Sequence, residues 1–218
     1  MAASQPGGRS TVLDHKSLPE RVHQILRQRI LDNELPAGTP LVELPLAAEF
    51  GVSRTTIRSA LRELQAERLI EINPRRGTTV SRMSQRDIDE VCYARFVLEA
   101  ACLPEVLPNG RAALVRAMTD ALEHMKSAAE AGDTSGVILA DTELHRATVA
   151  ATNHPVVLDM WDGLNAQMGA LMRSALDRQG IELDETVRRH VKLISVVRRQ
   201  GLDRVIDELR SHYLGPVD

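Results

Sequence analysis

Aromatic residues are scarce in this chain, since one Trp, two Tyr and two Phe make up 2% of its 218 residues. The apolar content of 43% is carried mainly by Ala, Val, Leu and Ile, which suits helices packed on helices more than a β-sandwich. A chain of this length holds one large domain or two modest ones. We therefore expect a mainly α protein.

Cysteines are few, and long apolar runs are absent. The two cysteines, Cys92 and Cys102, are ten positions apart, so on one helix their Cα atoms would lie about 15 Å apart, beyond disulfide reach. No apolar run approaches the roughly 20 residues of a membrane span, and residues 1–10 lack the apolar core of a signal peptide. We expect free core thiols and a cytoplasmic protein with no membrane partner.

The net charge of −3 conceals an asymmetry between the two parts of the chain. Residues 1–83 hold 12 Lys and Arg against 9 Asp and Glu, whereas residues 84–218 hold 15 against 21. Between Arg54 and Arg82, seven Arg face three Glu. The N-terminal part can therefore meet a polyanion, and the acidic remainder is not expected to bind nucleic acid.

Residues 46–64 have the pattern of a short helix, a tight turn and a longer helix. Gly51 supplies positive φ at the turn. One face of the second helix is apolar, formed by Ile57, Ala60, Leu61 and Leu64. Its N-terminal, outward end gathers Ser53, Arg54, Thr55 and Arg58. Such an end can hold a phosphate on hydroxyls and backbone N–H groups, and an Arg there can reach a base edge in the major groove.

Two short strands, 69–72 and 78–81, are expected after this motif, around a basic tip that contains Arg75 and Arg76. A helix-turn-helix followed by such a hairpin is a winged helix, whose tip can contact phosphates or a minor groove. The alternative is a solvated basic turn. An amphipathic helix over residues 19–33 precedes the motif, and the polar residues 1–15 are expected to form a disordered leader.

The motif Leu46-Ala-Ala-Glu-Phe-Gly-Val-Ser-Arg-Thr-Thr-Ile-Arg-Ser-Ala-Leu-Arg-Glu-Leu64 resembles the winged domain of GntR-family bacterial transcription regulators over residues 16–83. One departure is Leu44, where the fatty-acid regulator of this family has an Arg that meets DNA, so that contact should be absent. The resemblance implies DNA contact by Ser53, Arg54, Thr55, Thr56 and Arg58 on the second helix and by Arg75, Arg76 and Gly77 on the wing.

After a linker at residues 82–85, helical periodicity continues to the C-terminus, which predicts an antiparallel all-α bundle over residues 84–218. Pro104 should kink or end the first helix. The expected helices cover residues 86–107, 111–131, 134–152, 155–179, 184–200 and 202–213.

Three histidines interrupt the apolar stripes of these helices: His145, His190 and His212. Asp141 lies one turn before His145 on the same side of its helix. One carboxylate and three imidazoles suit Zn²⁺, Ni²⁺ or a similar ion. The alternative is four unrelated core polar residues, each satisfied by its neighbours.

Regulators of the FadR subfamily of GntR proteins carry an all-helical effector domain called FCD, and residues 84–218 resemble its metal-binding members. The resemblance implies that Asp141, His145, His190 and His212 bind a divalent metal, with zinc expected first and nickel or manganese as alternatives. Two features depart from the pattern: Arg189 stands where a Glu is frequent, and Gly-Asp reads Gly-Leu-Asp at residues 201–203. Neither replaces a ligand.

The same subfamily has Arg-x-x-x-Glu in its first effector-domain helix, matched here by Arg95 and Glu99. Arg95 lies on an apolar helix face, so two interpretations compete: a buried Arg95–Glu99 pair, or a clamp for an effector carboxylate. Asn153 and Asn165 are weaker candidates for effector binding.

We interpret the sequence as a dimeric, ligand-responsive transcription regulator, a repressor that binds a palindromic operator and responds to a small organic acid at the metal site. The sequence predicts no enzyme, because no placed general base or Gly-rich phosphate loop accompanies the three histidines. The alternatives are a metal-dependent hydrolytic enzyme, a regulator that senses the metal ion itself, and a metal that serves only as a structural staple.

Overall fold

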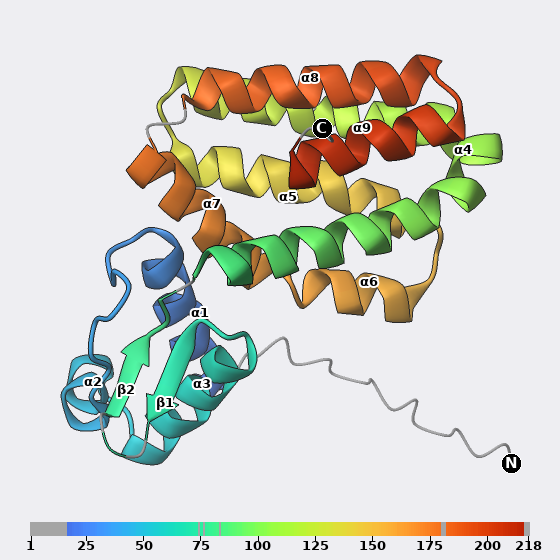
Figure 1. The fold of residues 1–218 in the computed structure, drawn as a ribbon. Coiled ribbons are helices and arrows are strands. Elements are labelled where there is room, and N and C mark those ends of the chain that lie inside the picture. Colours follow the sequence, from blue (N-terminus) through green and yellow to red (C-terminus); the bar gives the residue numbers. More distant parts are fainter. Residues whose placement is uncertain (1–16, 74, 76, 83, 180–181, 216–218) are drawn as a thin grey trace, which may run out of the picture.

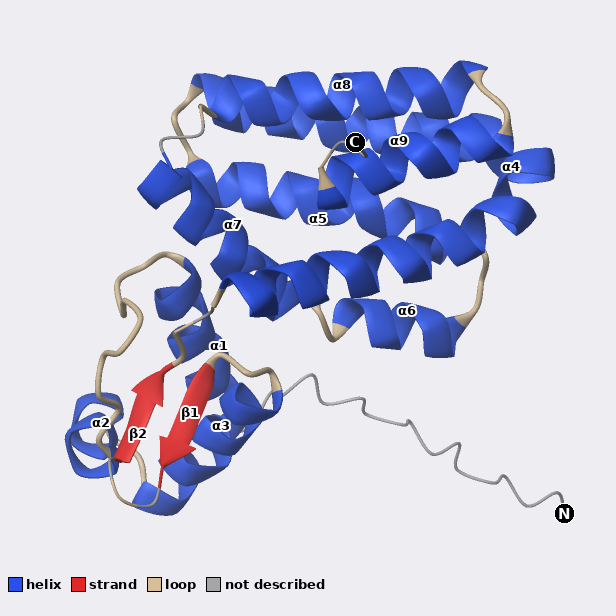
Figure 2. Ribbon diagram, viewed as in Figure 1, coloured by secondary structure: helices blue, strands red, loops and turns tan. Residues whose placement is uncertain are grey.

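A computed structural model describes residues 17–73, 75, 77–82, 84–179 and 182–215. Its N-terminal part, residues 17–82, comprises three helices and a two-stranded sheet, and the remainder is helical (Figures 1 and 2). The expected leader at residues 1–15 lies outside the described residues. The N-terminal elements are α1 (Leu18–Leu31), α2 (Glu43–Phe50), α3 (Arg54–Ala66), β1 (Ile70–Asn73) and β2 (Gly77–Val80).

The helix-turn-helix formed by α2 and α3 matches the sequence pattern. Gly51 takes φ 63° at the C-terminus of α2, the left-handed conformation that a glycine adopts without steric cost. Ser53 caps α3 by accepting a hydrogen bond from the Thr56 backbone N–H at 3.1 Å. The buried face of α3 consists of Ile57, Ala60, Leu61 and Leu64. It packs into the same core as Leu26 of α1, so the motif is anchored on a third helix.

The wing is an antiparallel hairpin in which Ile70 pairs with Val80 and Asn73 pairs with Gly77. Each strand lies one residue from its predicted span, because the ladder closes at Gly77, whose φ of 86° allows the tight return. An isolated bridge between Pro40 and Thr79 also joins the α1–α2 connection to the wing.

The C-terminal helices are α4 (Gln85–Glu130), α5 (Thr134–Ala150), α6 (Pro155–Asp162), α7 (Asn165–Gln179), α8 (Leu183–Arg199) and α9 (Leu202–Leu214). The prediction of two separate helices over 86–107 and 111–131 is wrong, because α4 is continuous across Pro104 and Pro108. Figure 1 shows α4 bending sharply near its label. Each proline removes one i→i−4 hydrogen bond, which explains a bend without a break.

The single helix predicted over residues 155–179 is also wrong, because the chain forms α6 and α7 with a turn at Gly163 and Leu164. The two helices serve different cores. Trp161 of α6 is fully buried against the first limb of α4, whereas Ala166 of α7 belongs to the core of the N-terminal part. Because of this turn, residues 155–179 contribute to two cores: α6 packs on α4 of the helical part, and the start of α7 packs on the N-terminal part.

A polar junction joins the two parts of the chain beside this shared core. Arg173 of α7 donates to the Leu31 carbonyl oxygen at 3.0 Å and lies 3.4 Å from Asp32, at the end of α1. Ser135, at the start of α5, donates to Asp32 at 2.5 Å and also contacts Arg173. These contacts, with α7 packed between α1 and α5, fix α1 against the helical part.

Among the described residues, no helix is long and apolar enough to cross a membrane. Cys92 and Cys102 are free, as their spacing predicted, and Cys102 is buried.

Candidate DNA-reading surface and buried ligand cluster

The exposed end of α3 gathers the polar residues that the sequence singled out for DNA contact. Arg54, Thr55 and Arg58 are exposed, whereas Thr56 is half-buried and shares a 2.9 Å hydrogen bond with the Ser53 hydroxyl. The hydroxyls of Ser53 and Thr56 thus stand at the helix N-terminus, where backbone N–H groups and the helix dipole attract a phosphate.

On the wing, Arg75 and Gly77 are exposed, and the Arg75 backbone N–H donates to the Asn73 side chain at 2.9 Å. Arg76 lies outside the described residues. Leu44, at the start of α2, has a side chain 65% exposed and brings no charge to this surface. At this end of the motif, the exposed basic side chains are those of α3 and the wing.

Glu43 holds both α3 arginines, a contact that sequence reasoning missed. Its carboxylate accepts from Arg58 Nε at 3.0 Å and Nη2 at 2.8 Å, and from Arg54 Nη2 at 3.1 Å. The hydrogen bond from Arg58, with a smaller contribution from Arg54, lowers the pKa of Glu43 to about 2, although partial burial opposes the shift. The carboxylate is therefore ionised at neutral pH.

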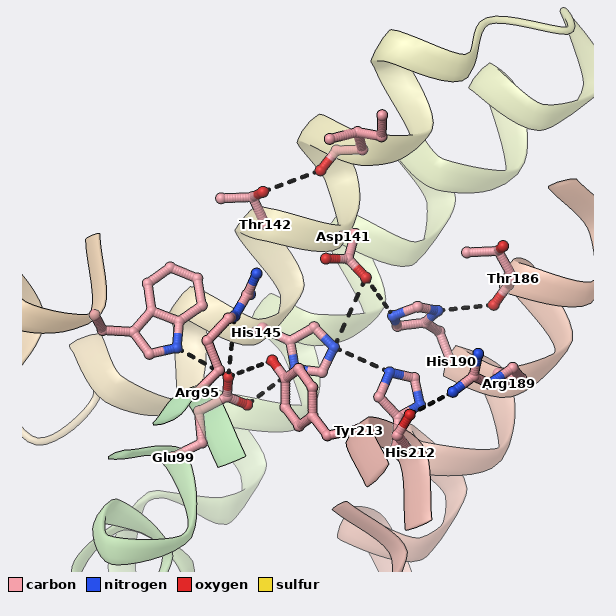
Figure 3. Close-up of polar contacts among 12 residues, drawn as sticks. Arg95, Glu99, Asp141, Thr142, His145, Thr186, Arg189, His190, His212 and Tyr213 are labelled. Atoms are coloured by element: carbon pink, nitrogen blue, oxygen red, sulfur yellow. Dashed lines mark hydrogen bonds and ion pairs between the residues drawn. The ribbon is translucent and has the colours of Figure 1, made fainter. Parts of the chain in front are cut away.

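The four residues proposed as metal ligands come together in the helical part (Figure 3). Asp141 and His145 project from α5, His190 from α8 and His212 from α9, and one possible ligand atom from each lies within 4.8 Å of all the others. Asp141 Oδ1 lies 2.9 Å from His190 Nε2 and 3.8 Å from His145 Nε2, and His145 Nε2 lies 3.2 Å from His212 Nε2.

The outer nitrogens of two rings fix which nitrogen faces inward. His190 Nδ1 lies 2.7 Å from the Thr186 carbonyl oxygen, and His145 Nδ1 lies 2.9 Å from a carboxylate oxygen of Glu99. Both oxygens are acceptors, so each Nδ1 can donate its hydrogen outward, and each ring then turns Nε2 toward Asp141. In the form that binds a metal, that Nε2 presents a lone pair. Within the described chain, His190 Nε2 is buried without a hydrogen-bond partner.

This convergence of lone pairs fits a divalent cation. Three imidazole nitrogens and a carboxylate form a borderline-soft N₃O set, which suits Zn²⁺ and related ions. The outer hydrogen bonds to Glu99 and to the Thr186 carbonyl oxygen are of the kind that orient metal-bound histidines. The residues present therefore fit a metal ion.

Burial and mutual repulsion set the charges in the cluster. Burial lowers the pKa of His212 well below its usual value, and the neighbouring His190 and His145 lower it further. For Asp141, burial would raise the pKa, but the contact with His190 and the electrostatic influence of His145 and Arg95 outweigh it, so the pKa of Asp141 is lowered. Neutral His212 and ionised Asp141 are the forms that bind metals.

Arg95 is fully buried beside this cluster. Its guanidinium carbon lies 4.2 Å from the centroid of the Trp161 ring and 5.6 Å from that of Tyr213. The Glu99 carboxylate lies 3.9 Å from Arg95 Nε, too far for a hydrogen bond. All three guanidinium nitrogens are buried with no hydrogen-bond partner among the residues that the structure describes.

Glu99 is occupied by other donors. It accepts hydrogen bonds from Trp161 Nε1 at 2.9 Å, from the Tyr213 hydroxyl at 2.6 Å and from His145. The simple Arg95–Glu99 pair weighed from the sequence is therefore a weak ion pair without a hydrogen bond. Sequence reasoning missed the roles of Trp161 and Tyr213, because only the scarcity of aromatic residues in the chain marks them.

The remaining sequence candidates lie as follows. Asn153 is exposed in the turn after α5 with φ 56°, a conformation that asparagine tolerates, so turn geometry accounts for it. Asn165 donates to Asp162 at 3.1 Å, while its Oδ1 is buried without a partner in the described part of the chain. Arg189, the departure from the family pattern, donates to the His212 carbonyl oxygen and so ties the end of α9 to α8.

Both the N-terminal part and the helical part match known protein families. The model for "Bacterial regulatory proteins, gntR family" matches residues 18–80, and the FCD domain model matches residues 90–215, more than half of the chain. The chain belongs to the GntR family of bacterial regulatory proteins and carries an FCD domain. The FadR subfamily is consistent with this combination.

Two curated relatives align with most of this GntR regulator. A gluconate operon transcriptional repressor of Bacillus licheniformis is 29% identical over 92% of this chain and 84% of its own. A probable D-xylose utilization operon transcriptional repressor of Paenarthrobacter nicotinovorans is 28% identical over 93% and 86%. A crystal structure of a Rhodococcus GntR regulator shares the fold, with a TM-score of 0.78 at 23% identity over 91% of this chain and 94% of that one.

The protein is therefore a DNA-binding transcription regulator, since its family and its relatives are regulators and not enzymes. The interpretation of the histidine cluster as a hydrolytic centre is set aside on this ground.

Proposed function

We propose that this regulator is a repressor that binds a palindromic operator as a homodimer and releases it when a small organic acid binds at a divalent metal in the FCD domain. Residues 16–83 would form the DNA-binding domain and residues 84–218 the dimerisation and effector domain. Both relatives are named as repressors, which supports the repressor role, and the name of the gluconate operon repressor supports an organic acid as the class of effector.

The observation that carries the effector proposal is the unpaired guanidinium of Arg95. A buried charge without hydrogen bonds is costly, and a planar carboxylate takes two N–H donors of a guanidinium at once. The Arg95 guanidinium lies over the Trp161 ring, a cation–π contact that helps to hold it in place. Arg95 would hold one carboxylate of the effector, and Asn165 Oδ1 is a further buried acceptor for a hydroxyl.

Asp141, His145, His190 and His212 would hold the metal. A bound divalent ion would supply positive charge and a coordination position for a carboxylate oxygen. Glu99 keeps His145 in the tautomer that presents Nε2, and Arg189 holds the His212 backbone in place. Zinc fits this donor set first, with nickel or manganese as alternatives.

Communication with DNA would pass through the junction of Arg173, Asp32 and Ser135. Ser135 and the ligand Asp141 lie on the same helix, α5, and α7 packs against both α5 and α1. A change in the position of α5 or α7 therefore moves α1 and with it the α3 arginines. In a dimer, a shift of a few ångströms between the two α3 helices prevents simultaneous docking on two half-sites.

At the DNA, Arg54 and Arg58 would read bases, with Ser53, Thr55 and Thr56 on phosphates. Arg75, Arg76 and Gly77 of the wing would contact the backbone or the minor groove. An Arg75→Ala change should then weaken binding to all duplexes, whereas Arg58→Ala should also relax the preference at one base pair.

The test uses full-length protein purified without a His-tag and loaded with zinc. Metal content is measured first. Calorimetric titration with a panel of sugar acids and dicarboxylic acids follows, and then release of a duplex selected from a random pool. We expect one metal per chain, acid binding only with metal present, and acid-driven release from DNA. In Arg173→Ala, acid should bind as in the parent but release less DNA.

Two outcomes separate the remaining alternatives. If zinc alone changes DNA affinity and no acid in the panel binds, the metal ion itself is the signal. If zinc raises only thermal stability, with DNA affinity unchanged by metal or acid, the ion is a structural staple and the effector proposal fails.

A further inference from the structure

The side chain of Glu43 stands between α2 and α3 and contacts both arginines of the α3 N-terminus. We propose that Glu43 is a positioning residue for DNA reading, which holds the Arg58 guanidinium by one edge so that the other edge is presented to a guanine. This inference rests on the proposed reading of a base by Arg58 and adds a determinant of specificity outside α3.

The donor geometry of Arg58 leaves the reading edge free. Glu43 takes the Nε hydrogen and one Nη2 hydrogen, at 3.0 and 2.8 Å. A guanidinium has five N–H donors, so three remain, two on Nη1 and one on Nη2. The Nη1–Nη2 edge is the fork that matches O6 and N7 of guanine in the major groove. Arg58 can therefore keep Glu43 and bind a guanine at the same time.

Glu43 is less exposed than the two arginines that it contacts. Its side chain is 27% exposed, against 62% for Arg54 and 51% for Arg58. Arg54 reaches it from a second position of α3, at 3.1 Å. As the first residue of α2, Glu43 also lies at a helix N-terminus, where the dipole favours a negative charge. Two arginines and one helix end therefore hold this carboxylate in place.

This arrangement has two consequences for DNA binding. Ordering a long side chain before binding removes an entropic cost, which corresponds to about 2- to 10-fold in affinity for the base that it reads. A carboxylate close to the DNA also repels phosphates, so duplexes without the matching guanine bind less well. Glu43 should therefore raise the ratio of specific to non-specific affinity rather than affinity for all DNA.

The test begins with a random duplex pool selected by the parent and by Arg58→Ala. The base pair whose preference disappears in Arg58→Ala is the one that Arg58 reads. Anisotropy titrations of the parent, Glu43→Gln and Glu43→Asp then use the selected duplex, the same duplex with that base pair changed, and an unrelated duplex. Glu43→Asp keeps the charge but shortens the side chain by one methylene.

We expect Glu43→Gln to reduce discrimination at that base pair about 3- to 10-fold and to raise affinity for the unrelated duplex. Glu43→Asp keeps the negative charge, so it should bind the unrelated duplex as weakly as the parent does. Its shorter side chain should no longer orient Arg58, so the preference for the selected base pair should be lost. Glu49→Gln is the matched control, because Glu49 also lies on α2 and pairs with an arginine, Arg29, at 2.6 Å, away from α3. Thermal unfolding checks that each variant is folded.

Unchanged discrimination in Glu43→Gln would overturn the inference. So would tighter binding of the selected duplex with full discrimination, because Glu43 would then compete with DNA for Arg58. If Arg58→Ala loses no base preference, the proposed reading role of Arg58 fails instead, and the two failures are thus distinguished.

Discussion

Glu43 and Glu99 each lie beside an arginine, but of these two only Glu43 accepts hydrogen bonds from its arginine. At the surface, Glu43 binds the Arg58 guanidinium with two hydrogen bonds. In the interior, Glu99 lies 3.9 Å from Arg95 and gives its hydrogen bonds to His145, Trp161 and Tyr213. The exposed Arg58 is held by a carboxylate. The buried Arg95 has only a weak ion pair and no hydrogen bond among the described residues.

The two arginines therefore differ in how their remaining hydrogen-bond donors can be satisfied when no ligand is bound. Donors left over on Arg58 can bind water until DNA replaces it, so the surface cluster is stable without a ligand. Unpaired donors on Arg95 and the converging lone pairs around Asp141 have no such substitute. In the proposed function, a metal cation and an effector anion would supply these partners, and removing either should have larger effects than any change at the surface.

The largest effect is expected from removal of the metal. Binding to the folded state at a hundredfold excess over Kd contributes about 2.7 kcal/mol, or roughly 5–10 °C in melting temperature for a chain of this size. Chelator should therefore lower the melting temperature of the zinc-loaded parent. In His190→Ala and His212→Ala, metal content should fall well below one per chain, and chelator should change the melting temperature little.

His124→Ala is the matched control, because its side chain is 72% exposed and pairs with Glu143 away from the cluster. It should bind metal like the parent. If the parent cannot be loaded with zinc, nickel or manganese, the metal proposal fails, and the four residues are core polar groups satisfied by their neighbours.

The second effect concerns Arg95. Because its donors are unpaired, Arg95→Met in the zinc-loaded, acid-free protein should raise stability by about 1–2 kcal/mol, since apolar residues often replace buried charges at no loss. The same change should abolish acid binding measured by calorimetry. Arg146→Met is the comparison variant, since Arg146 is fully paired with Asp162 at 2.9 and 3.0 Å. It should leave acid binding intact, and a marked loss of stability in Arg95→Met would contradict the unpaired assignment.

The sequence predicted the elements better than the contacts between them. Helical spacing placed Ile57 and Leu64 on one face, and Gly51 marked the turn, because these depend on neighbours in the chain. Of the two outcomes predicted at Pro104, a kink and not an end is found, but the continuation of α4 to Glu130 was not predicted. The packing of α4 against other helices outweighs the lost backbone hydrogen bonds.

For the site, sequence reasoning found the residues but not their partners. The four proposed ligands were identified by spacing and by family resemblance, and the structure brings them together. The hydrogen bonds from Trp161 and Tyr213 to Glu99 join residues 62 and 114 positions apart, which no local pattern encodes. The role of Glu43 could not be predicted for the same reason: its contacts with Arg54 and Arg58 depend on how α2 packs against α3, which no local pattern shows.

A smaller effect is expected from pH in metal-free protein. The pKa of His212 is lowered well below its usual value by burial, whereas in the unfolded chain it is about 6.5. The unfolded state then binds the additional proton, so stability is full above pH 6.5 and falls as the pH drops below it. The slope is at most about 1.4 kcal/mol per pH unit for one proton. Denaturant titrations at pH 7 and 5 should show this loss in the parent and less of it in His212→Gln, and equal losses would remove His212 as the cause.

The smallest effect is expected at Glu43. Its pKa is lowered from 4.5 to about 2 by the hydrogen bond from Arg58, so its contribution is present above pH 4.5 and is lost as the pH falls toward 2. Because the pair is at the surface, water and salt screen it, and the contribution should stay below about 1 kcal/mol. Acid titrations of unfolding in low salt should show a slightly flatter limb between pH 4.5 and 2 for Glu43→Gln and for Arg58→Ala, and 1 M salt should remove the difference. A loss as large as that of the buried cluster would mean that Glu43 stabilises the fold itself, and its role would then not be limited to orienting Arg58.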